Sequence, residues 1–279
     1  MLHDRREDGA GRVTQVLAFD GVSDMLDNAI PVAEASCRLR RTLKDSEWVG
    51  RSFDGGWGEV ACAAASPWED GETIVSGMLE QLTDAVLPMP QSRRRVSVWG
   101  DDGDELCRDR LESGFPAWRG TRRACRSGPA TVTIVADVTA SCSKSPEDIL
   151  WRGAAAVALA TMLEHAGYRV AVWGAFHGSC MENGESVLST WCLKTVSDPL
   201  DSGTLIAGLS GWYFRTAVFA SCELATGTLK EDLGRAMELP EWIGDVVGDP
   251  APRVVSGVWG LKSAVEWLRA ALEGGNHAG

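Results

Sequence analysis

The sequence lacks a long apolar run, and no stretch approaches the roughly 18 uninterrupted apolar residues that a membrane-spanning helix needs. Residues 1–8 are charged, and no apolar segment follows them, so we expect no secretory signal. These two absences predict a cytoplasmic protein, in the host cytoplasm if the gene belongs to a phage. The preference for arginine and the scarcity of isoleucine, asparagine and tyrosine indicate a GC-rich source, either a bacterium or its phage.

The common catalytic motifs are also missing. There is no G-x-S-x-G, no Walker A loop and no G-x-G-x-x-G, so the sequence gives no support to the commonest hydrolases, nucleotidases and dinucleotide enzymes. Histidine is scarce, and we interpret His177, which follows a predicted strand, as a residue of a surface loop. None of the eight cysteines forms a C-x-x-C pair, so we expect reduced core thiols and no zinc or disulfide framework.

Positive charge is in deficit, because the formal net charge is −12. A charge of this sign repels phosphate backbones and anionic membranes, and it favours basic partners. Arginines interleaved with Trp99 and Trp118 are nevertheless concentrated between Arg93 and Arg126, a pattern that can bind single strands by charge and stacking. Acidic residues fill the same stretch, so we interpret it as a solvated or internally paired segment and disfavour nucleic acid as a partner.

Tryptophan is abundant, with twelve residues against two tyrosines. The tryptophans are spread along the chain, and we expect each to anchor a core or an interface. Subunit interfaces are enriched in large aromatics, so this content is also compatible with an oligomer or a larger assembly.

Two regions differ in pattern. Apolar residues recur at helical spacing from Val13 to Val86, and the proline-containing segment 88–92 then breaks the pattern. We therefore predict an N-terminal helical region over residues 1–90 and an α/β domain over residues 91–279. Later in the chain, residues 187–196 are predicted to form an edge strand.

The clearest element of the second region is a strand–helix–strand unit. Residues 131–136 are β-branched and apolar, as in a strand buried on both faces. Ser145 and Asp148 form a capping-box pattern around Pro146, which predicts a helix to about residue 165. Residues 168–173 form the next strand. Two strands joined by one helix indicate a parallel crossover.

A polar turn follows the first of these strands. Asp137, Thr139 and Ser141 lie at alternate positions just past its carboxyl end, where ligands of open α/β sheets bind. One carboxylate and two hydroxyls make a hard oxygen site suited to Mg²⁺ or Mn²⁺. The alternative is that these side chains only satisfy backbone donors at the turn.

This turn resembles the D-x-S-x-S motif of the metal-ion-dependent adhesion site in von Willebrand factor A domains. Thr139 replaces the first serine, and Thr204 matches a threonine that this family supplies from a later loop. The family's third element, an aspartate ending an apolar strand, has only Asp245 as a stand-in. The resemblance implies a Rossmann-like three-layer fold and a metal site at Asp137, Thr139, Ser141 and Thr204.

The whole chain is also similar to an uncharacterised family of phage and phage-like bacterial proteins. The tryptophan- and glycine-rich first part, the run Arg93 to Arg95 and the block from Leu163 to Tyr168 carry this similarity.

We favour a non-enzymatic protein-interaction module, for which the turn would supply the recognition edge and a bridging cation. Two alternatives stay open: a structural or assembly component of a phage particle, and a metal-dependent enzyme that uses the same edge on phosphate esters.

Overall fold

The computed structural model of the chain describes residues 1–7, 12–85, 96–100, 105–122, 131–179, 185–226 and 235–274. It has a mixed α/β fold, in which a seven-stranded sheet has the order β1-β2-β8-β7-β6-β10 and β9 pairs with β7. The strands are β1 (Leu2–Glu7), β2 (Val13–Phe19), β6 (Thr131–Asp137), β7 (Arg169–Ser179), β8 (Ser186–Lys194), β9 (Arg235–Ala236) and β10 (Arg253–Val255).

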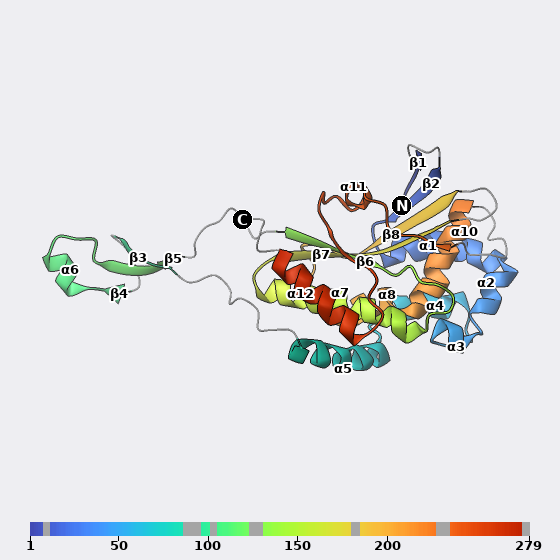
Figure 1. The fold of residues 1–279 in the computed structure, drawn as a ribbon, viewed down its shortest axis with the longest axis horizontal. Helices are drawn as coiled ribbons and strands as arrows, with labels where there is room; N and C mark the ends of the chain where they lie inside the picture. Colours follow the sequence, from blue (N-terminus) through green and yellow to red (C-terminus); the bar gives the residue numbers. More distant parts are fainter. Residues whose placement is uncertain are drawn as a thin grey trace.

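Helices cover the two faces of this sheet unequally, and Figure 1 shows α5, α7 and α12 on one side of it and α11 on the other. The helices are α1 (Val22–Ala35), α2 (Cys37–Thr42), α3 (Ser46–Val49), α4 (Trp57–Ala64), α5 (Glu69–Ala85), α7 (Pro146–His165), α8 (Ser202–Gly208), α9 (Gly211–Tyr213), the π-helix η1 (Phe214–Val218), α10 (Phe219–Thr226), α11 (Ile243–Val247) and α12 (Leu261–Gly274). The main core lies under the first group, and a small cluster around Val135, Leu188 and Ile243 lies under α11.

The predicted strand–helix–strand unit is confirmed. β6 and β7 pair in parallel from Thr131↔Arg169 to Asp137↔Ala175, and α7 connects them. Ser145 caps α7 by accepting from the backbone N–H of Asp148, whose carboxylate accepts from the N–H of Ser145 in return. Small residues on α7 allow close packing, because a Cβ added to Gly153 would lie 3.1 Å from Cβ of Leu209.

The predicted helical start of the chain is wrong. The chain begins with strands β1 and β2, which pair antiparallel, and β2 continues the main sheet by pairing in parallel with β8. The spacing of Leu17, Met25 and Ile30 that indicated one helix joins residues of β2 and α1, which are separate elements packed on one core. The helices expected beyond that point are present from Val22 to Ala85. The predicted boundary at residue 90 lies outside the described residues.

The predicted position of the strand at 187–196 is also wrong. This strand, β8, lies between β2 and β7 in the interior of the sheet. Two of its serines have partners there, since Ser189 Oγ lies 3.0 Å from Ser221 Oγ and Ser186 Oγ lies 2.7 Å from Thr14 Oγ1, whereas the buried hydroxyl of Thr190 has no partner within the described residues. A hydroxyl that has a hydrogen-bond partner can be buried at a small cost in folding free energy.

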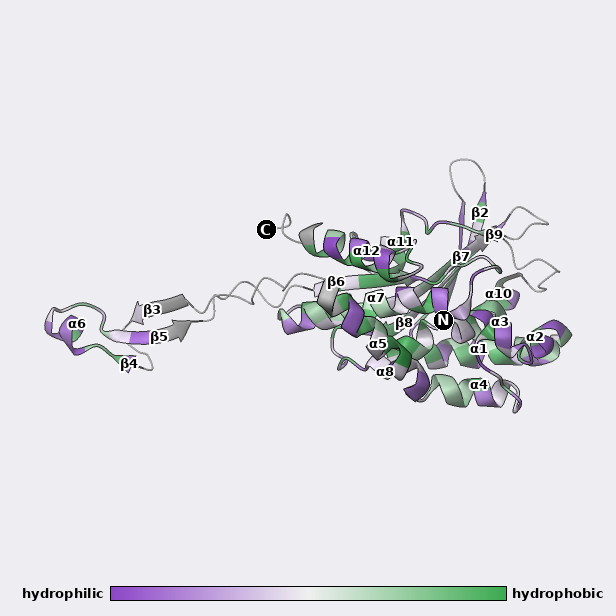
Figure 2. Cartoon of the chain, turned by 60° about the horizontal axis from the view of Figure 1, so that its bottom comes forward, coloured by the Kyte–Doolittle hydropathy of each residue, from purple (hydrophilic) through white to green (hydrophobic). Residues whose placement is uncertain are grey.

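A second, small sheet is inserted between α5 and β6. It contains β3 (Val96–Gly100), β4 (Glu105–Leu106) and β5 (Trp118–Arg122) in the order β3-β5-β4, with α6 (Arg108–Glu112) between β4 and β5. β3 and β5 pair antiparallel from Val96↔Arg122 to Gly100↔Trp118. The small sheet lies apart from the main sheet in both views of the chain (Figures 1 and 2).

The described residues also bear on the expected absence of a membrane-spanning helix and on the expected core thiols. No helix in the described part of the chain combines the length and the apolar character required to span a bilayer. Among the described cysteines, Cys192 and Cys222 are buried, as predicted for core thiols, whereas Cys37, Cys62 and Cys142 are exposed.

Candidate functional site

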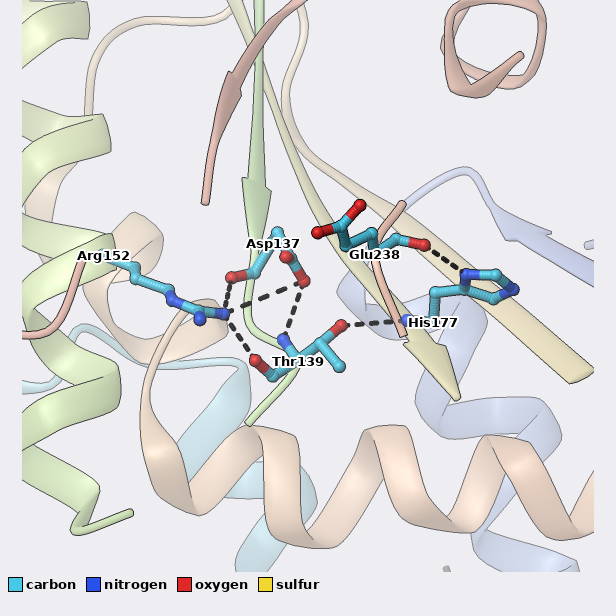
Figure 3. Close-up of polar contacts among 5 residues, drawn as sticks. All are labelled: Asp137, Thr139, Arg152, His177 and Glu238. Carbon is cyan, nitrogen blue, oxygen red and sulfur yellow. Dashed lines mark hydrogen bonds and ion pairs between the residues drawn. The ribbon is translucent and has the colours of Figure 1, made fainter. Parts of the chain in front are cut away.

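The buried polar side chains of Asp137, Thr139 and Arg152 meet at the carboxyl end of β6, and His177 joins them through its backbone N–H (Figure 3). Asp137 ends β6, Thr139 follows it, Arg152 comes from α7, and His177 comes from β7. Each is less than a tenth exposed, and we call these four residues the Asp137 cluster. Because Asp137 is level with Ala175 in the parallel pairing, the next residue of β7 on the same face is His177.

The Arg152 guanidinium is the centre of the cluster. Its Nη1 donates to the backbone carbonyls of Asp137 and Thr139, the second at 2.6 Å, and lies 3.8 Å from Oδ1 of Asp137. The ring of Trp259 covers the guanidinium carbon at 3.7 Å, close enough for a cation–π contact. The side chain thus ties the end of β6 to α7.

The Asp137 carboxylate is bound from within the protein. Its Oδ1 accepts from the backbone N–H of Thr139 at 2.9 Å, which closes the turn after the strand. Burial raises the pKa of Asp137, and the guanidinium of Arg152 opposes that rise. Burial lowers the pKa of Arg152 in turn, but arginine keeps its proton in proteins, so the guanidinium is a fixed cation that favours the ionised form of Asp137.

His177 lies in β7, so its predicted position in a surface loop is wrong. The strand continues to Ser179, beyond the residues whose apolar pattern defined it in the sequence. The backbone N–H of His177 donates to Oγ1 of Thr139 at 3.0 Å, and its Nδ1 lies 2.6 Å from the carbonyl oxygen of Glu238. A carbonyl can only accept, so Nδ1 carries the proton and Nε2 is an acceptor. Within the described residues, Nε2 is buried without a hydrogen-bond partner, and burial lowers the pKa of His177.

The remaining predicted metal ligands are placed differently from Asp137 and Thr139. Ser141 is exposed, with its Oγ 3.1 Å from Oγ of Ser143. Thr204 lies in the first turn of α8, where its Oγ1 donates to Oδ2 of the capping residue Asp201 at 2.7 Å. Asp245 lies in α11, not at a strand end, and pairs with Arg6 at 3.3 Å.

These positions give little support to a cation site. In the described ranges, no group of three or more histidine, cysteine, aspartate or glutamate side chains could hold a metal ion. The carboxylate of Asp137 is already balanced by a guanidinium, and Oγ1 of Thr139 already accepts from His177. A divalent cation prefers several oxygen ligands at one point, so the described residues fit it poorly.

Sequence reasoning missed Arg152, although one signal was present. Arg152 stands three residues after Ile149 and four residues before Ala156. It therefore lies on the same face of the helix as these two buried residues. An arginine on a buried face requires an acceptor nearby, and the adjacent strand end supplied Asp137.

We predict that Arg152→Met lowers the free energy of unfolding by about 3–5 kcal/mol, because it leaves the buried Asp137 carboxylate without its cation. Adding Asp137→Asn should recover part of that loss. Urea unfolding at neutral pH measures both effects, with Arg40→Met as the matched control, since Arg40 is exposed and its change should cost within about 0.5 kcal/mol. Equal decreases in the free energy of unfolding for Arg152→Met and Arg40→Met would contradict the pairing of Arg152 with Asp137.

We also predict that His177 makes stability depend on pH. Its folded pKa lies below the ordinary value, so the unfolded chain binds more protons as the pH falls through about 6.5, and the free energy of unfolding decreases. The free energy of unfolding changes because of His177 by at most about 1.4 kcal/mol per pH unit. Asp137, whose pKa is raised, contributes with the opposite sign at lower pH.

The measurement is urea unfolding at several pH values between about 5 and 7, on the wild type and on His177→Gln. The variant should lose part of the pH slope, whereas His165→Gln, a change at an exposed histidine, should keep it. A slope that survives in His177→Gln would show that the neutral, buried imidazole is not its source.

A comparison with protein families matches residues 7–245 to a family described as a domain of unknown function (DUF7192). No curated protein and no solved structure matches the chain. The matched span includes the small sheet and all four residues of the Asp137 cluster, while Trp259, which covers Arg152, lies beyond it. Because the match covers most of the sequence, the chain belongs to this family, the domain of unknown function DUF7192.

Proposed function

We propose that the chain is a non-enzymatic protein-interaction module with a Rossmann-like, von Willebrand A-like sheet. The parallel unit of β6, α7 and β7, with β10 parallel on the other side of β6, supports that fold. The presence of α11 over the face opposite α7 supports a three-layer arrangement. The proposal includes a phage or phage-like bacterial source and a place in the cytoplasm, as the composition indicates.

The observation that carries the proposal is the apolar surface of the small sheet. Five of its large hydrophobic side chains are exposed: Trp99, Leu106, Leu111, Phe115 and Trp118. Phe115 is 62% exposed and Leu111 is 57% exposed. Trp99 and Phe115 both contact Arg110, and Leu106 is opposite Trp118 in the strand pairing, so the exposed side chains form two apolar groups on the small sheet. Monomeric proteins rarely leave such groups in water, and they mark interaction sites.

The small sheet also buries little of its own surface. Of its described side chains, Ala117 is the buried hydrophobic one. Three short strands and a five-residue helix need a hydrophobic face packed on something to be stable. Contact with a partner would supply that burial. Arg110 stacks on Trp99 at 4.5 Å, and arginine with aromatics is the composition that protein interfaces favour.

This proposal moves the recognition surface away from the turn after β6. Asp137 and Thr139 are buried there, and the carboxylate has an internal cation. A partner could reach Ser141 but not the carboxylate that was expected to bind through a bridging ion. A metal-dependent enzyme using that edge has no comparable support.

The partner is a protein, and the charge of −12 favours a basic one. A component of a phage particle would use the same apolar surface between copies of the chain, so self-association distinguishes that alternative. Light scattering after size exclusion should show a monomer if the surface serves a different protein.

We predict that a photo-crosslinking amino acid at Phe115 forms covalent adducts with one host or phage protein in cells. The same amino acid at Ile74 is the matched control, because Ile74 is also a large exposed side chain but lies on α5. Adducts at both positions, or at neither, would overturn the proposed surface. Adducts between two copies of the chain would favour the particle component.

The Mg²⁺ or Mn²⁺ site that the sequence predicts at Asp137, Thr139, Ser141 and Thr204 has a separate test. Because Arg152 lies beside the carboxylate, we expect the melting temperature to be unchanged when EDTA is replaced by Mg²⁺ or Mn²⁺. A rise in melting temperature with the ion in the wild type that Asp137→Asn abolishes would instead support a cation site.

A further inference from the structure

We propose that a cavity between α2 and α3 binds a small phosphate ester that carries an aromatic ring. The cavity has a volume of about 450 Å³ and is lined by Cys37, Arg38, Arg41, Thr42, Asp45 and Trp48. Pockets for small molecules typically measure about 300–1,000 Å³, so a ligand of mononucleotide size fits this range. The inference is independent of the small sheet and of the interaction proposed for it.

The geometry of α2 places the basic groups on one wall. Arg38, Arg41 and Thr42 stand at positions i, i+3 and i+4, which share one face of a helix. The hydroxyl of Thr42 donates to the carbonyl of Arg38 at 3.3 Å, so it is not a donor for a ligand. The donors that this wall presents to an anion are therefore guanidinium groups.

Positive charge is concentrated on α2, where Arg38 also interacts with the carboxylate of Glu223. Residues 37–44 contain three arginines and one lysine and no acidic residue, in a protein with a net charge of −12. The one acidic residue of the cavity, Asp45, uses its Oδ1 to accept from the backbone N–H of Trp48 at 3.0 Å, as the cap of α3. This local excess of positive charge favours an anionic ligand.

Phosphate fits these donors better than a single point charge does. A guanidinium presents paired N–H groups that match two phosphate oxygens, and a phosphate has enough oxygens to accept from two arginines at once. Arg38 and Arg41 both line the cavity from the same face of α2. Because Arg38 also interacts with Glu223, the phosphate is expected to depend chiefly on Arg41.

Trp48 supplies the apolar wall. Its indole is in contact with Arg215, whose guanidinium carbon lies 4.6 Å from the ring centroid, and with Phe219, whose ring centroid is 5.8 Å away. Arg215 is itself buried and donates to the carbonyls of Trp48 and Lys144. A half-buried indole fixed in this way offers a preformed contact for a planar ring, and such contacts do not depend on which base is present.

The test is calorimetric titration of the full chain with three probes: AMP, adenosine and inorganic phosphate. AMP carries both the phosphate and the ring, so it should bind saturably and at least about tenfold more tightly than either partial probe. Arg41→Gln should weaken AMP binding by about tenfold or more, because it removes charged hydrogen bonds to the phosphate.

The matched control is Arg40→Gln, which makes the same change on the same helix at an exposed position outside the cavity lining. It should leave AMP binding within about twofold of the wild type. Circular dichroism and melting curves should show that both variants fold, since both side chains are exposed.

Three results would overturn the proposal. One is no saturable binding of AMP to the wild type. Another is equal weakening by Arg40→Gln and Arg41→Gln, which would indicate a general charge effect. The third is a partial probe that binds as well as AMP: adenosine would exclude recognition of the phosphate, and inorganic phosphate would exclude recognition of the ring.

Discussion

The contact between the Arg152 guanidinium and the end of β6 is the constraint on which the centre of the structure depends. Two ionised groups are held away from water there, and either alone would be very costly to bury. Three elements have to be in register for the pair to form: β6 ends at Asp137, α7 presents Arg152, and Trp259 covers the guanidinium. The parallel pairing of β6 with β7 then brings His177 to the same place.

The same contact places a guanidinium beside the motif that resembles a metal site. The turn has the residue types that bind Mg²⁺ in the family it resembles, but a side chain of the protein supplies the positive charge. A carboxylate balanced from inside has less need of an external cation. We propose that recognition takes place instead at the exposed aromatics of the small sheet and at the arginine-lined cavity beside α2, which differ in chemistry.

Local signals predicted the centre of the fold well. The capping box at Ser145 and the β-branched run before Asp137 are each complete within a few residues, so the sequence alone was sufficient. The errors arose where the deciding contact is distant. β2 was assigned to a helix because its partner, β8, lies more than 150 residues later, and β8 was placed at an edge because β2 was not recognised as its neighbour. Arg152 and His177 were missed as site residues for the same reason, since only tertiary pairing brings them to Asp137.

The pairing of β2 with β8 also has a consequence for synthesis on the ribosome. Thr14 and Ser186 are 172 residues apart, so at about 5–20 residues per second β2 emerges roughly ten to thirty seconds before its neighbour exists. During that interval the β2 edge of the β1–β2 hairpin lacks its partner, and an apolar face that includes Leu17 and Phe19 is not yet covered. Nascent chains of this protein therefore pass through a state in which a binding chaperone, or another nascent chain, can compete for the place that β8 later takes.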